Sequence, residues 1–492
     1  MQEYKLFIDG EWVDSSTGET FDDINPASLE LIARLQKASE DDVSRAVESA
    51  GKAYEGWSSM PAPRRAKILF RAARMLEERK EELSRLMTTE MGKVLKEARG
   101  DVQEAIDISY YSAGEGRRLL GETTPSELPD KFCMTVRRPI GVVGLITPWN
   151  FPIAIPAWKI MPALISGNTL VLKPASDTPL LSIELVRMLV EAGLPKGVLN
   201  LVTGEGSIVG KAMVHNKNIR AISFTGSLET GKWILGEASK DMKRVSLELG
   251  GKNPIIVMDD ADLNLAVDGV LWGAFGTTGQ RCTAASRVIV HEKVLPAFEK
   301  KLIERTKMLK LGDGLDENID IGPVINNSQL QKIANYVRIG KEEGAKLVYG
   351  GNIAKPMAGY FFEPTIFADV TPGMRIAQEE IFGPVVSLLG ADNLDEAIEI
   401  ANSVEYGLSS SIYTQDIKNA FKAIEKVESG ITYINAPTIG AEIHLPFGGI
   451  KSTGNGTREA GTTAIEEFTE IKTVYFDYSG KLQKAQIDTG EA

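Results

Sequence analysis

Cysteine and histidine are scarce in this chain, which has two cysteines and three histidines among 492 residues. Two cysteines cannot build a disulfide framework, and so few suit a reducing compartment, so we expect a cytoplasmic protein. The histidines, His215, His291 and His444, show no spacing typical of a metal site, and we predict no bound metal. Chemistry that depends on a disulfide or a metal is therefore not expected.

Long apolar runs and an excess of positive charge are also missing. No uninterrupted apolar stretch is long enough to cross a bilayer. The beginning, MQEYKLFIDGEWVDSSTGE, lacks the basic and apolar regions of a secretory signal. The formal net charge of -12 disfavours binding to nucleic acids or anionic membranes, because both draw on clustered lysine and arginine. We expect a small-molecule partner, with no nucleic acid and no membrane.

Short β-rich runs that alternate with helical stretches occupy residues 139 to 291. The runs GVVGLI, TLVLK, VLNLV, AISF and RVSLEL are apolar on both faces, which is typical of a parallel sheet covered on both sides by helices. A second alternation follows and continues to about residue 435. Since 492 residues exceed what one hydrophobic core holds, we predict an α/β protein with two doubly wound parallel-sheet domains.

The regions on either side of this alternation give simpler predictions. The dipeptide Asp9–Gly10 predicts a hairpin near the beginning. Apolar positions at helical spacing predict scaffold helices over residues 40–57 and from Pro61 towards Glu90. The alternating segment TVYFDYSGK near the end predicts a strand that pairs with an edge in this chain or in another subunit.

The run GTTGQRCTAAS places Cys282 among small residues. A lone intracellular cysteine is most often a small buried hydrophobe, whereas a nucleophile needs a base or a lowered pKa, and room for a substrate. None of the three histidines has a spacing that ties it to Cys282. Glu248, which ends a strand-like run just before Gly250 and Gly251 in LELGGKNP, is either a base or a solvent-facing carboxylate. The two glycines allow backbone to approach another group closely.

Three further motifs lie where strand-like runs end, which is where doubly wound sheets bind ligands. PWNFP contains Asn150, whose amide either faces a developing oxyanion or only forms a turn. TLVLKPASDTP contains Lys173, which either contacts ribose or phosphate or is a surface charge. FTGS joins a strand to a helix through Gly226, so its N–H groups can face phosphate. GEGSIVG at 204–210 matches a dinucleotide fingerprint poorly.

Seven motifs in order, PWNFP, KPAS, FTGS, LELGGKNP, GQRCTA, EEIFGP and PFGGIKSTG, resemble those of the aldehyde dehydrogenase superfamily. The resemblance runs from about Phe7 to Tyr478, which is nearly the whole chain. Each motif alone is modest, but seven at the right order and approximate spacing are specific. The resemblance implies a cofactor domain and a catalytic domain, both doubly wound, and a small β oligomerisation element.

The resemblance also implies domain limits and an assembly. The cofactor-binding domain is expected at 1–120 and 140–249, and the catalytic domain at 250–449. The oligomerisation element is expected at 121–139 and 470–492. The expected assembly is a homodimer or a homotetramer.

Site roles follow from the resemblance at matching positions. Cys282 resembles the nucleophile and Glu248 the general base. Asn150 resembles the side-chain half of the oxyanion hole, with the backbone N–H of Cys282 as the other half. The resemblance implies ribose contacts at Lys173 and Glu380, an aromatic contact at Phe382 beside the nicotinamide ribose, and pyrophosphate contacts at Gly226 and Ser227. The full predicted cofactor site comprises Ile146, Thr147, Pro148, Trp149, Lys173, Ser176, Gly206, Gly210, Phe224, Gly226, Ser227, Leu249, Gly250, Glu380 and Phe382.

The implied reaction is the NAD(P)-dependent oxidation of an aldehyde to a carboxylic acid. Attack by the Cys282 thiolate gives a thiohemiacetal, loss of hydride gives a thioester, and water activated by Glu248 hydrolyses it. This sequence of steps needs no histidine. Arg281 either favours the thiolate or faces outward from its loop, and we favour the outward position.

The cofactor preference and the substrate rest on finer features. Ser176 stands where NAD-restricted relatives often have an acid that repels a 2′-phosphate, so we favour NADP, or dual use, over NAD. The segments YYSAGEG, PWNFPIAIPAWK and GQRCTAASRVIV look most like the branch that oxidises 2-oxoglutarate semialdehyde and similar small semialdehydes. The loop NAPTIGAEIHLP has no arginine to hold a carboxylate, which weakens a succinate-semialdehyde assignment. Glyceraldehyde, lactaldehyde or a broad aldehyde range, a CoA-acylating enzyme and a non-catalytic homologue are the alternatives.

Overall fold

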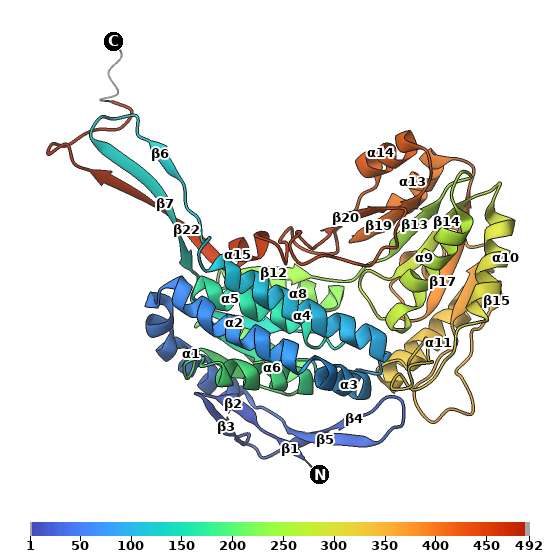
Figure 1. Ribbon diagram of the computed structural model, residues 1–492, viewed down its shortest axis with the longest axis horizontal. Helices are drawn as coiled ribbons and strands as arrows, with labels where there is room; N and C mark the ends of the chain where they lie inside the picture. Colours follow the sequence, from blue (N-terminus) through green and yellow to red (C-terminus); the bar gives the residue numbers. More distant parts are fainter. Residues whose placement is uncertain (1, 488–492) are drawn as a thin grey trace.

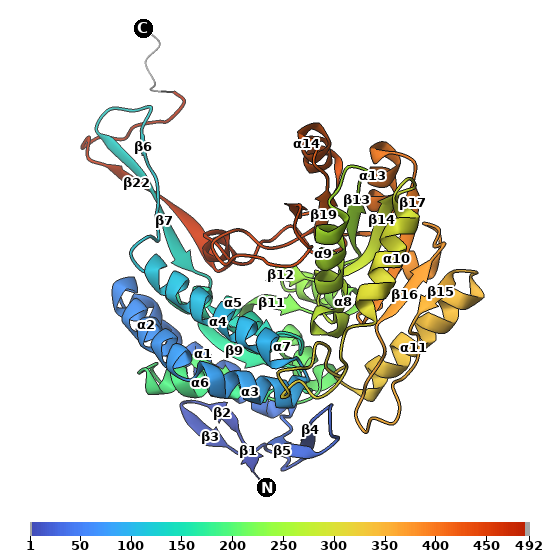
Figure 2. The same cartoon turned by 45° about the vertical axis from the view of Figure 1, so that its right-hand side comes forward.

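The computed structural model describes residues 2–487, so Met1 and the end of the predicted 470–492 segment lie outside the described residues. Two sheets of seven strands form the body, and a narrow arm of three strands projects from it (Figure 1). The two sheets lie side by side, with their helices around them, in both views (Figures 1 and 2). The predicted α/β class with two doubly wound sheets is confirmed.

The first sheet has the strand order β12-β11-β8-β9-β10-β2-β3. The five strands from β12 to β10 are parallel, and the hairpin of β2 and β3 closes the other edge in antiparallel orientation. Asp9 and Gly10 have φ of 55° and 79°, so the predicted hairpin turn is confirmed. The bounds are β2 (Leu6–Ile8), β3 (Glu11–Val13), β8 (Val142–Ile146), β9 (Thr169–Lys173), β10 (Leu199–Leu201), β11 (Ile219–Thr225) and β12 (Arg244–Glu248).

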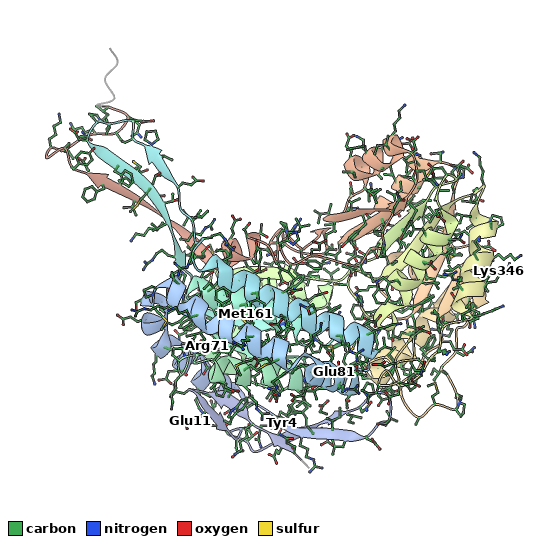
Figure 3. The ribbon with its side chains drawn as sticks, in the orientation of Figure 1. Tyr4, Glu11, Arg71, Glu81, Met161 and Lys346 are labelled. Carbon is green, nitrogen blue, oxygen red and sulfur yellow. The ribbon has the colours of Figure 1, made fainter. Side chains whose placement is uncertain are left out.

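Helices cover both faces of the first sheet. They are α1 (Glu40–Ser59), α2 (Ala62–Glu78), α3 (Lys80–Met91), α4 (Leu95–Glu115), α5 (Ala154–Ser166), α6 (Leu180–Glu191), α7 (Lys211–His215) and α8 (Leu228–Ser239). The helix predicted from Pro61 to Glu90 is in fact two helices, because Arg79 leaves helical geometry at φ -101° and ψ 12°. In Figure 3, Met161 of α5 lies in the interior, and Arg71 and Glu81 lie on the outer helices.

The second sheet has the strand order β15-β16-β17-β14-β13-β19-β20, and all neighbours are parallel except β15 and β16. Glu11 of β3 and Lys346 of β15 lie at opposite sides of the molecule (Figure 3). The strands are β13 (Asn253–Val257), β14 (Ala285–His291), β15 (Lys346–Tyr349), β16 (Thr365–Ala368), β17 (Val385–Ala391), β19 (Ser409–Tyr413) and β20 (Ile431–Ile434). Its helices are α9 (Leu263–Phe275), α10 (Leu295–Thr306), α11 (Asn327–Glu342), α12 (Arg375–Gln378), α13 (Leu394–Asn402) and α14 (Ile417–Lys426).

The arm is an antiparallel sheet in which β7 lies between β6 and β22. Its strands are β6 (Thr123–Pro125), β7 (Lys131–Pro139) and β22 (Thr469–Asp477). The predicted terminal strand therefore pairs within its own chain. Its side chains are largely open to solvent, with Tyr475 70% and Phe476 63% exposed. Among residues 2–487, no helix has the length and apolar character needed to cross a membrane.

Smaller elements complete the chain. A three-stranded sheet of β1 (Glu3–Tyr4), β4 (Thr20–Ile24) and β5 (Leu31–Gln36) flanks the first sheet (Figure 1), and β18 (Tyr406–Gly407) pairs with β21 (Ile450–Lys451) in antiparallel orientation. The short helix α15 (Thr463–Glu467) leads into β22. Neither α4 nor the sheet of β1, β4 and β5 is predicted from the sequence pattern.

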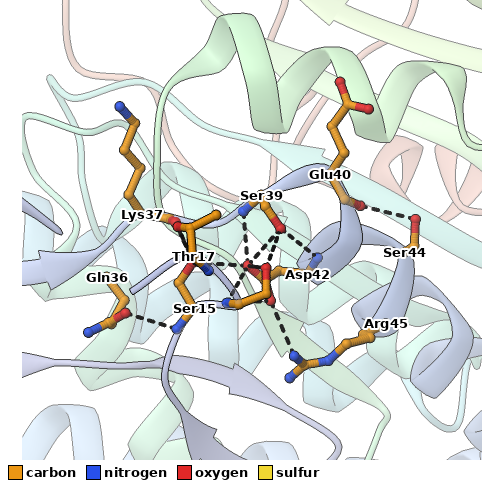
Figure 4. A network of polar contacts seen from close by, with 10 residues as sticks. Ser15, Thr17, Gln36, Lys37, Ser39, Glu40, Asp42, Ser44 and Arg45 are labelled. Carbon is orange, nitrogen blue, oxygen red and sulfur yellow. Dashed lines mark hydrogen bonds and ion pairs between the residues drawn. The ribbon is translucent and has the colours of Figure 1, made fainter. Parts of the chain in front are cut away.

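The N-terminus of α1 is fixed by a polar network around Asp42 (Figure 4). The Ser39 hydroxyl accepts from the Asp42 N–H, and the Asp42 carboxylate accepts from the Ser39 N–H at 2.9 Å, which is a capping box. The same carboxylate accepts from Ser15 and Ser16, so it also ties the segment that follows β3 to the helix. Burial alone would raise the pKa of Asp42, but these hydrogen bonds lower it.

We predict that Asp42→Ala lowers the free energy of unfolding by about 1–3 kcal/mol at pH 7, because it removes several hydrogen bonds to a charged acceptor. The pKa of Asp42 is lowered in the folded state, so its stabilising contribution is present above the ordinary carboxyl pKa and is lost as pH falls through the folded value. Asp41→Ala, at the exposed neighbour, is the control. Equal thermal shifts for the two variants, measured by scanning calorimetry, would contradict the network.

Candidate active site

The carboxyl ends of β8, β9, β11 and β12 lie at one edge of the first sheet, and this edge carries most of the predicted site. Glu248 ends β12, and β13 of the second sheet begins only five residues later at Asn253. Cys282 and Glu248 line one cavity of about 60 Å³, which has room for a few water molecules. The cavity is lined by Glu104, Phe151, Ile155, Trp158, Thr225, Glu248, Leu249, Arg281, Cys282, Thr283, Gly440, Ala441, Phe447 and Glu459.

The loop that carries Cys282 is held rigidly from several sides. Thr277 and Thr278 have φ of 52° and 56°, and the Glu97 carboxylate accepts the Thr277 N–H at 2.9 Å and 3.0 Å. The Asn253 amide donates to the carbonyl oxygens of Cys282, at 2.7 Å, and Ala284, at 2.9 Å. The left-handed threonines cost free energy, and these contacts offset it. Asn253 and Glu97 are therefore positioning residues that the sequence reasoning missed.

The two glycines after Glu248 are required by close packing. A Cβ at Gly251 would lie 2.3 Å from the Cys282 carbonyl oxygen, and a Cβ at Gly250 would lie 2.5 Å from a Glu380 carboxylate oxygen. The Gly251 N–H donates to that same carboxylate at 2.9 Å. The prediction that these glycines allow a close approach is confirmed, and the partners are Cys282 and Glu380.

The thiol and its predicted base are both buried. Burial, together with the charges of the nearby carboxylates Glu380 and Glu248, raises the pKa of Cys282 to about 12. The thiol is therefore neutral at pH 7, and attack requires a proton acceptor. Burial also raises the pKa of Glu248 well above its ordinary value, with the Glu459 charge adding to the effect and Lys159 opposing it.

A buried charge cluster adjoins Glu248. The Lys159 ammonium on α5 forms an ion pair with Glu459 and donates to the Ser223 hydroxyl at 2.8 Å. Burial raises the pKa of Glu467, a third carboxyl in this cluster, to about 7. Sequence reasoning missed the cluster, although a lone lysine in the apolar run IPAWKIMPALI was a usable signal, because a buried cation needs a partner.

Asn150 lies beside the cysteine loop. Its side-chain amide is buried and donates to the carbonyl oxygen of Gln280, two residues before Cys282, at 3.0 Å. The turn that carries it follows β8 directly, and α5 begins just after it. The structure thus brings Asn150, Cys282 and Glu248 to the same edge of the sheet.

The predicted ribose contacts lie on different parts of the site. Lys173 ends β9, its ammonium donates to the Pro174 carbonyl at 2.9 Å, and burial lowers its pKa to about 8. Glu380 lies between α12 and β17, next to the second sheet, and Lys332 and Lys252 are the nearby cations. Lys332 is a further candidate contact that sequence reasoning missed, since its surrounding helix reads only as amphipathic.

The segment that carries Phe382 is held by an aromatic contact and by hydrogen bonds. Phe382 has φ of 59°, and its ring meets Trp149 edge-on at 5.3 Å. The Gln329 amide holds the carbonyl oxygens of Ile381 and Phe382 at 3.0 Å and 2.6 Å. Gln329 is another positioning residue that the motifs do not mark.

The predicted phosphate segments form helix starts. Ser227 caps α8, with its hydroxyl accepting the Thr230 N–H at 3.3 Å, and the Gly226 N–H donates to the Glu248 carbonyl at 3.1 Å. A Cβ at Gly226 would lie 2.5 Å from the ring of Phe224. The segment Gly206–Gly210 forms one turn of π-helix before α7. It is therefore not the glycine-rich loop of a dinucleotide fingerprint, which its sequence matches poorly.

The remaining predicted residues lie along the strand ends. Ile146 ends β8, and the next residue, Thr147, donates its N–H to the Lys173 carbonyl at 3.1 Å. Pro148 continues this turn. Leu249 donates its N–H to the Thr453 carbonyl at 2.7 Å. The Ser176 hydroxyl donates to the Gly204 carbonyl at 2.9 Å, which leaves its oxygen free only as an acceptor.

Arg281 does not face outward, so that prediction is wrong. Its side chain is only 12% exposed, and its guanidinium lies 5.4 Å from the ring centres of both Phe151 and Trp272. Its Nε donates to the Thr277 hydroxyl at 2.8 Å, and Nη2 lies 3.8 Å from Glu97. Stacking on two rings and attraction to a buried carboxylate hold the side chain inside.

The histidines pair with carboxylates elsewhere. His215 contacts Glu237 at 3.0 Å, His291 lies 3.9 Å from Asp259, and His444 lies 3.5 Å from Glu442. None of the three lines the cavity around Cys282. Glu248 is thus one of three carboxyl groups, with Glu104 and Glu459, that line the cavity with the thiol.

Comparison with known proteins agrees with this geometry. The model of the aldehyde dehydrogenase family matches residues 12–474. The chain is 45% identical over 477 residues to an alpha-ketoglutaric semialdehyde dehydrogenase of Bacillus subtilis, which covers 96% of this chain and 98% of that protein. It is 45% identical over 480 residues to a 2,5-dioxopentanoate dehydrogenase of Saccharolobus solfataricus, which covers 96% of this chain and 99% of that protein.

The fold is equally close to a solved structure. The crystal structure of betaine aldehyde dehydrogenase from Staphylococcus aureus in complex with NAD+ superimposes with a TM-score of 0.95 at 39% identity, and covers 97% of this chain and 95% of that one. The chain therefore belongs to the aldehyde dehydrogenase family and is an NAD(P)-dependent oxidoreductase that acts on aldehydes.

Proposed function

We propose that this enzyme oxidises a small semialdehyde such as 2-oxoglutarate semialdehyde to the acid, with Cys282 as nucleophile and Glu248 as general base. The observation that carries the catalytic part is that Cys282 and Glu248 line one buried cavity, with Asn150 beside the cysteine loop. The names of the relatives from Bacillus subtilis and Saccharolobus solfataricus support the substrate class.

The residues perform the two halves of the reaction in turn. Glu248 takes the thiol proton as Cys282 bonds to the aldehyde carbon, and the Asn150 amide and the Cys282 N–H stabilise the oxyanion. Bound NAD(P) would supply the acceptor for the hydride of the thiohemiacetal, and Cys282 would then hold the acyl group as a thioester. After the thiol proton has passed from Glu248 to solvent, Glu248 deprotonates a water that attacks the thioester. The carbon–sulfur bond then breaks, the acid leaves, and the Cys282 sulfur regains a proton.

The residues at the strand ends fit a nicotinamide dinucleotide. Lys173 places a buried cation at the end of β9, and the first turn of α8, which begins after Gly226 and the cap Ser227, presents backbone N–H groups suited to a pyrophosphate, while the Gly226 N–H itself is hydrogen-bonded to the Glu248 carbonyl. Gly250 leaves room that a Cβ would fill next to Glu380, a ribose acceptor. The other cofactor residues named from the sequence border this same edge, and we favour NADP or dual use because Ser176 carries no charge.

We also propose a role for each domain of the chain. The first sheet and its helices, within 1–120 and 140–249, would hold the cofactor, and 250–449 would carry the catalytic loop. The arm, 121–139 with the strand that begins near residue 470, would join copies into a homodimer or homotetramer. The exposed aromatic side chains of β22 support this role.

We predict that Cys282→Ala lowers kcat for aldehyde oxidation by more than about a thousandfold, since no other thiol lines the cavity. Cys133→Ala is the matched control, because Cys133 is buried in β7 of the arm. Initial rates of nicotinamide reduction at saturating aldehyde measure both. Activity that survives in Cys282→Ala and disappears in Cys133→Ala would overturn the assignment.

We predict that Glu248→Gln separates hydride transfer from hydrolysis, because the amide keeps the shape of the side chain and cannot deprotonate water. Stopped-flow absorbance should show a burst approaching one reduced nicotinamide per active subunit, followed by a steady rate at least about a hundredfold below wild type. A steady rate equal to wild type would make Glu248 a bystander. Loss of the burst would show that Glu248 acts first on the thiol.

We predict that Ser176→Glu lowers the ratio of kcat/KM for NADP to kcat/KM for NAD by about tenfold, through repulsion of the 2′-phosphate worth about 1.4 kcal/mol. Ser176→Gln adds the same bulk without charge and is the control. If both variants change the ratio equally, or neither does, the side chain at 176 does not face the adenosine ribose.

A further inference from the structure

Besides Glu248 and the ion-paired Glu459, two charged side chains line the Cys282 cavity. They are Arg281, next to the nucleophile in the chain, and Glu104, on α4. Most of the other lining side chains are apolar or aromatic, among them Phe151, Ile155 and Phe447. Burying charged groups in such surroundings costs free energy unless each group is paired with or binds a partner.

The guanidinium of Arg281 is placed to accept an anion. Its Nε has a close hydrogen bond with Thr277, whereas the contact of Nη2 with Glu97 is long at 3.8 Å. The Glu97 carboxylate is already engaged by the Thr277 N–H. The guanidinium lies 5.4 Å from the ring centres of both Phe151 and Trp272, which confine it, and a planar fork of donors suits a carboxylate.

The Glu104 carboxyl faces the same space and changes charge near neutral pH. Burial raises its pKa to about 7, the charges of Asp101 and Asp107 on its own helix add to this, and Arg281 and Lys93 oppose it. The charge of Glu104 also raises the pKa of Tyr433, on β20. Lys93 is itself paired with Asp101 at 2.7 Å, so Arg281 is the cation left to act in the cavity.

We propose that Arg281 and the Glu104 carboxyl together recognise the carboxylate and the adjacent oxo group of an oxo-acid semialdehyde whose aldehyde carbon reaches Cys282. This rests on the proposed function and deepens it. Arg281 binds the carboxylate, and the protonated Glu104 donates a hydrogen bond to it or to the oxo oxygen. The pair supplies the cation that the loop NAPTIGAEIHLP lacks.

The test uses a ratio of two substrates, so that effects on the shared chemistry cancel. The quantity is kcat/KM for 2-oxoglutarate semialdehyde divided by kcat/KM for pentanal, an uncharged aldehyde of the same length. Arg281→Met keeps an unbranched side chain between the two rings and removes the charge. We expect the ratio to fall by at least about tenfold. Arg338→Met is the control, since Arg338 is exposed on α11 and pairs with Glu342.

The pH profile tests Glu104. Below its folded pKa the carboxyl is neutral and donates; above it the carboxylate repels an anionic substrate and pairs with Arg281. The wild-type ratio should therefore fall as pH rises from 6 to 9, with a midpoint near 7. In Glu104→Gln the ratio should be independent of pH, because titration of Cys282 and Glu248 affects both substrates alike.

The outcomes separate this inference from the function on which it rests. A wild-type ratio near 1 at every pH would show that the enzyme does not select a carboxylate, and both ideas would be wrong. A high wild-type ratio that Arg281→Met and Glu104→Gln leave unchanged, in size and in pH dependence, would overturn the inference alone. If Arg281→Met does not fold, the profile of Glu104→Gln decides.

Discussion

The close packing of Gly250 and Gly251 against two other segments is the constraint on which the site depends. These residues form the crossing from the first sheet to the second, between the end of β12 and the start of β13. One glycine lies against the carboxylate of Glu380 and the other against the backbone of Cys282. Glu248 before them and Asn253 after them are thereby held on either side of the cysteine loop. Cys282, Glu248 and Glu380 are thus positioned by six consecutive residues.

Burial then determines the electrostatics of the site. Burial raises the pKa of Cys282 and also that of Glu248. In both groups it therefore favours the protonated, neutral form. Lys159 and Glu459 form an ion pair beside Glu248. The charge of Glu459 raises the pKa of Glu248, and the charge of Lys159 lowers it. A carboxylate whose pKa is raised by burial is a stronger base than a free one, so it is able to accept a proton from the thiol and later from water.

Much of this arrangement is readable in the sequence, for identifiable reasons. Apolar runs and turn residues are local signals, so the parallel strands, α1, α6, α8 and the first hairpin follow from them. Glycine pairs and prolines at strand ends mark the site, because close approach and sharp turns require those residues. The break at Arg79 was not predicted, because no proline or glycine marks it.

What the sequence does not reveal depends on contacts between distant segments. Glu97 supports the cysteine loop from 180 positions away, and Lys159 meets Glu459 across 300. The inward position of Arg281 depends on Phe151 and Trp272, which lie on different elements. An arginine in a loop is usually exposed, and only the two rings and the buried Glu97 reverse that expectation.

The central claim is that oxidation proceeds through an acyl group on Cys282 whose hydrolysis needs Glu248. Peptide mass mapping of Glu248→Gln, quenched in acid after mixing with 2-oxoglutarate semialdehyde and NADP, tests it most directly. The account predicts the mass of the 2-oxoglutaryl group on the peptide that contains Cys282, and no adduct in wild type quenched after the substrate is consumed. Reduced nicotinamide without an adduct on Cys282, or an adduct on Cys133 instead, would contradict it.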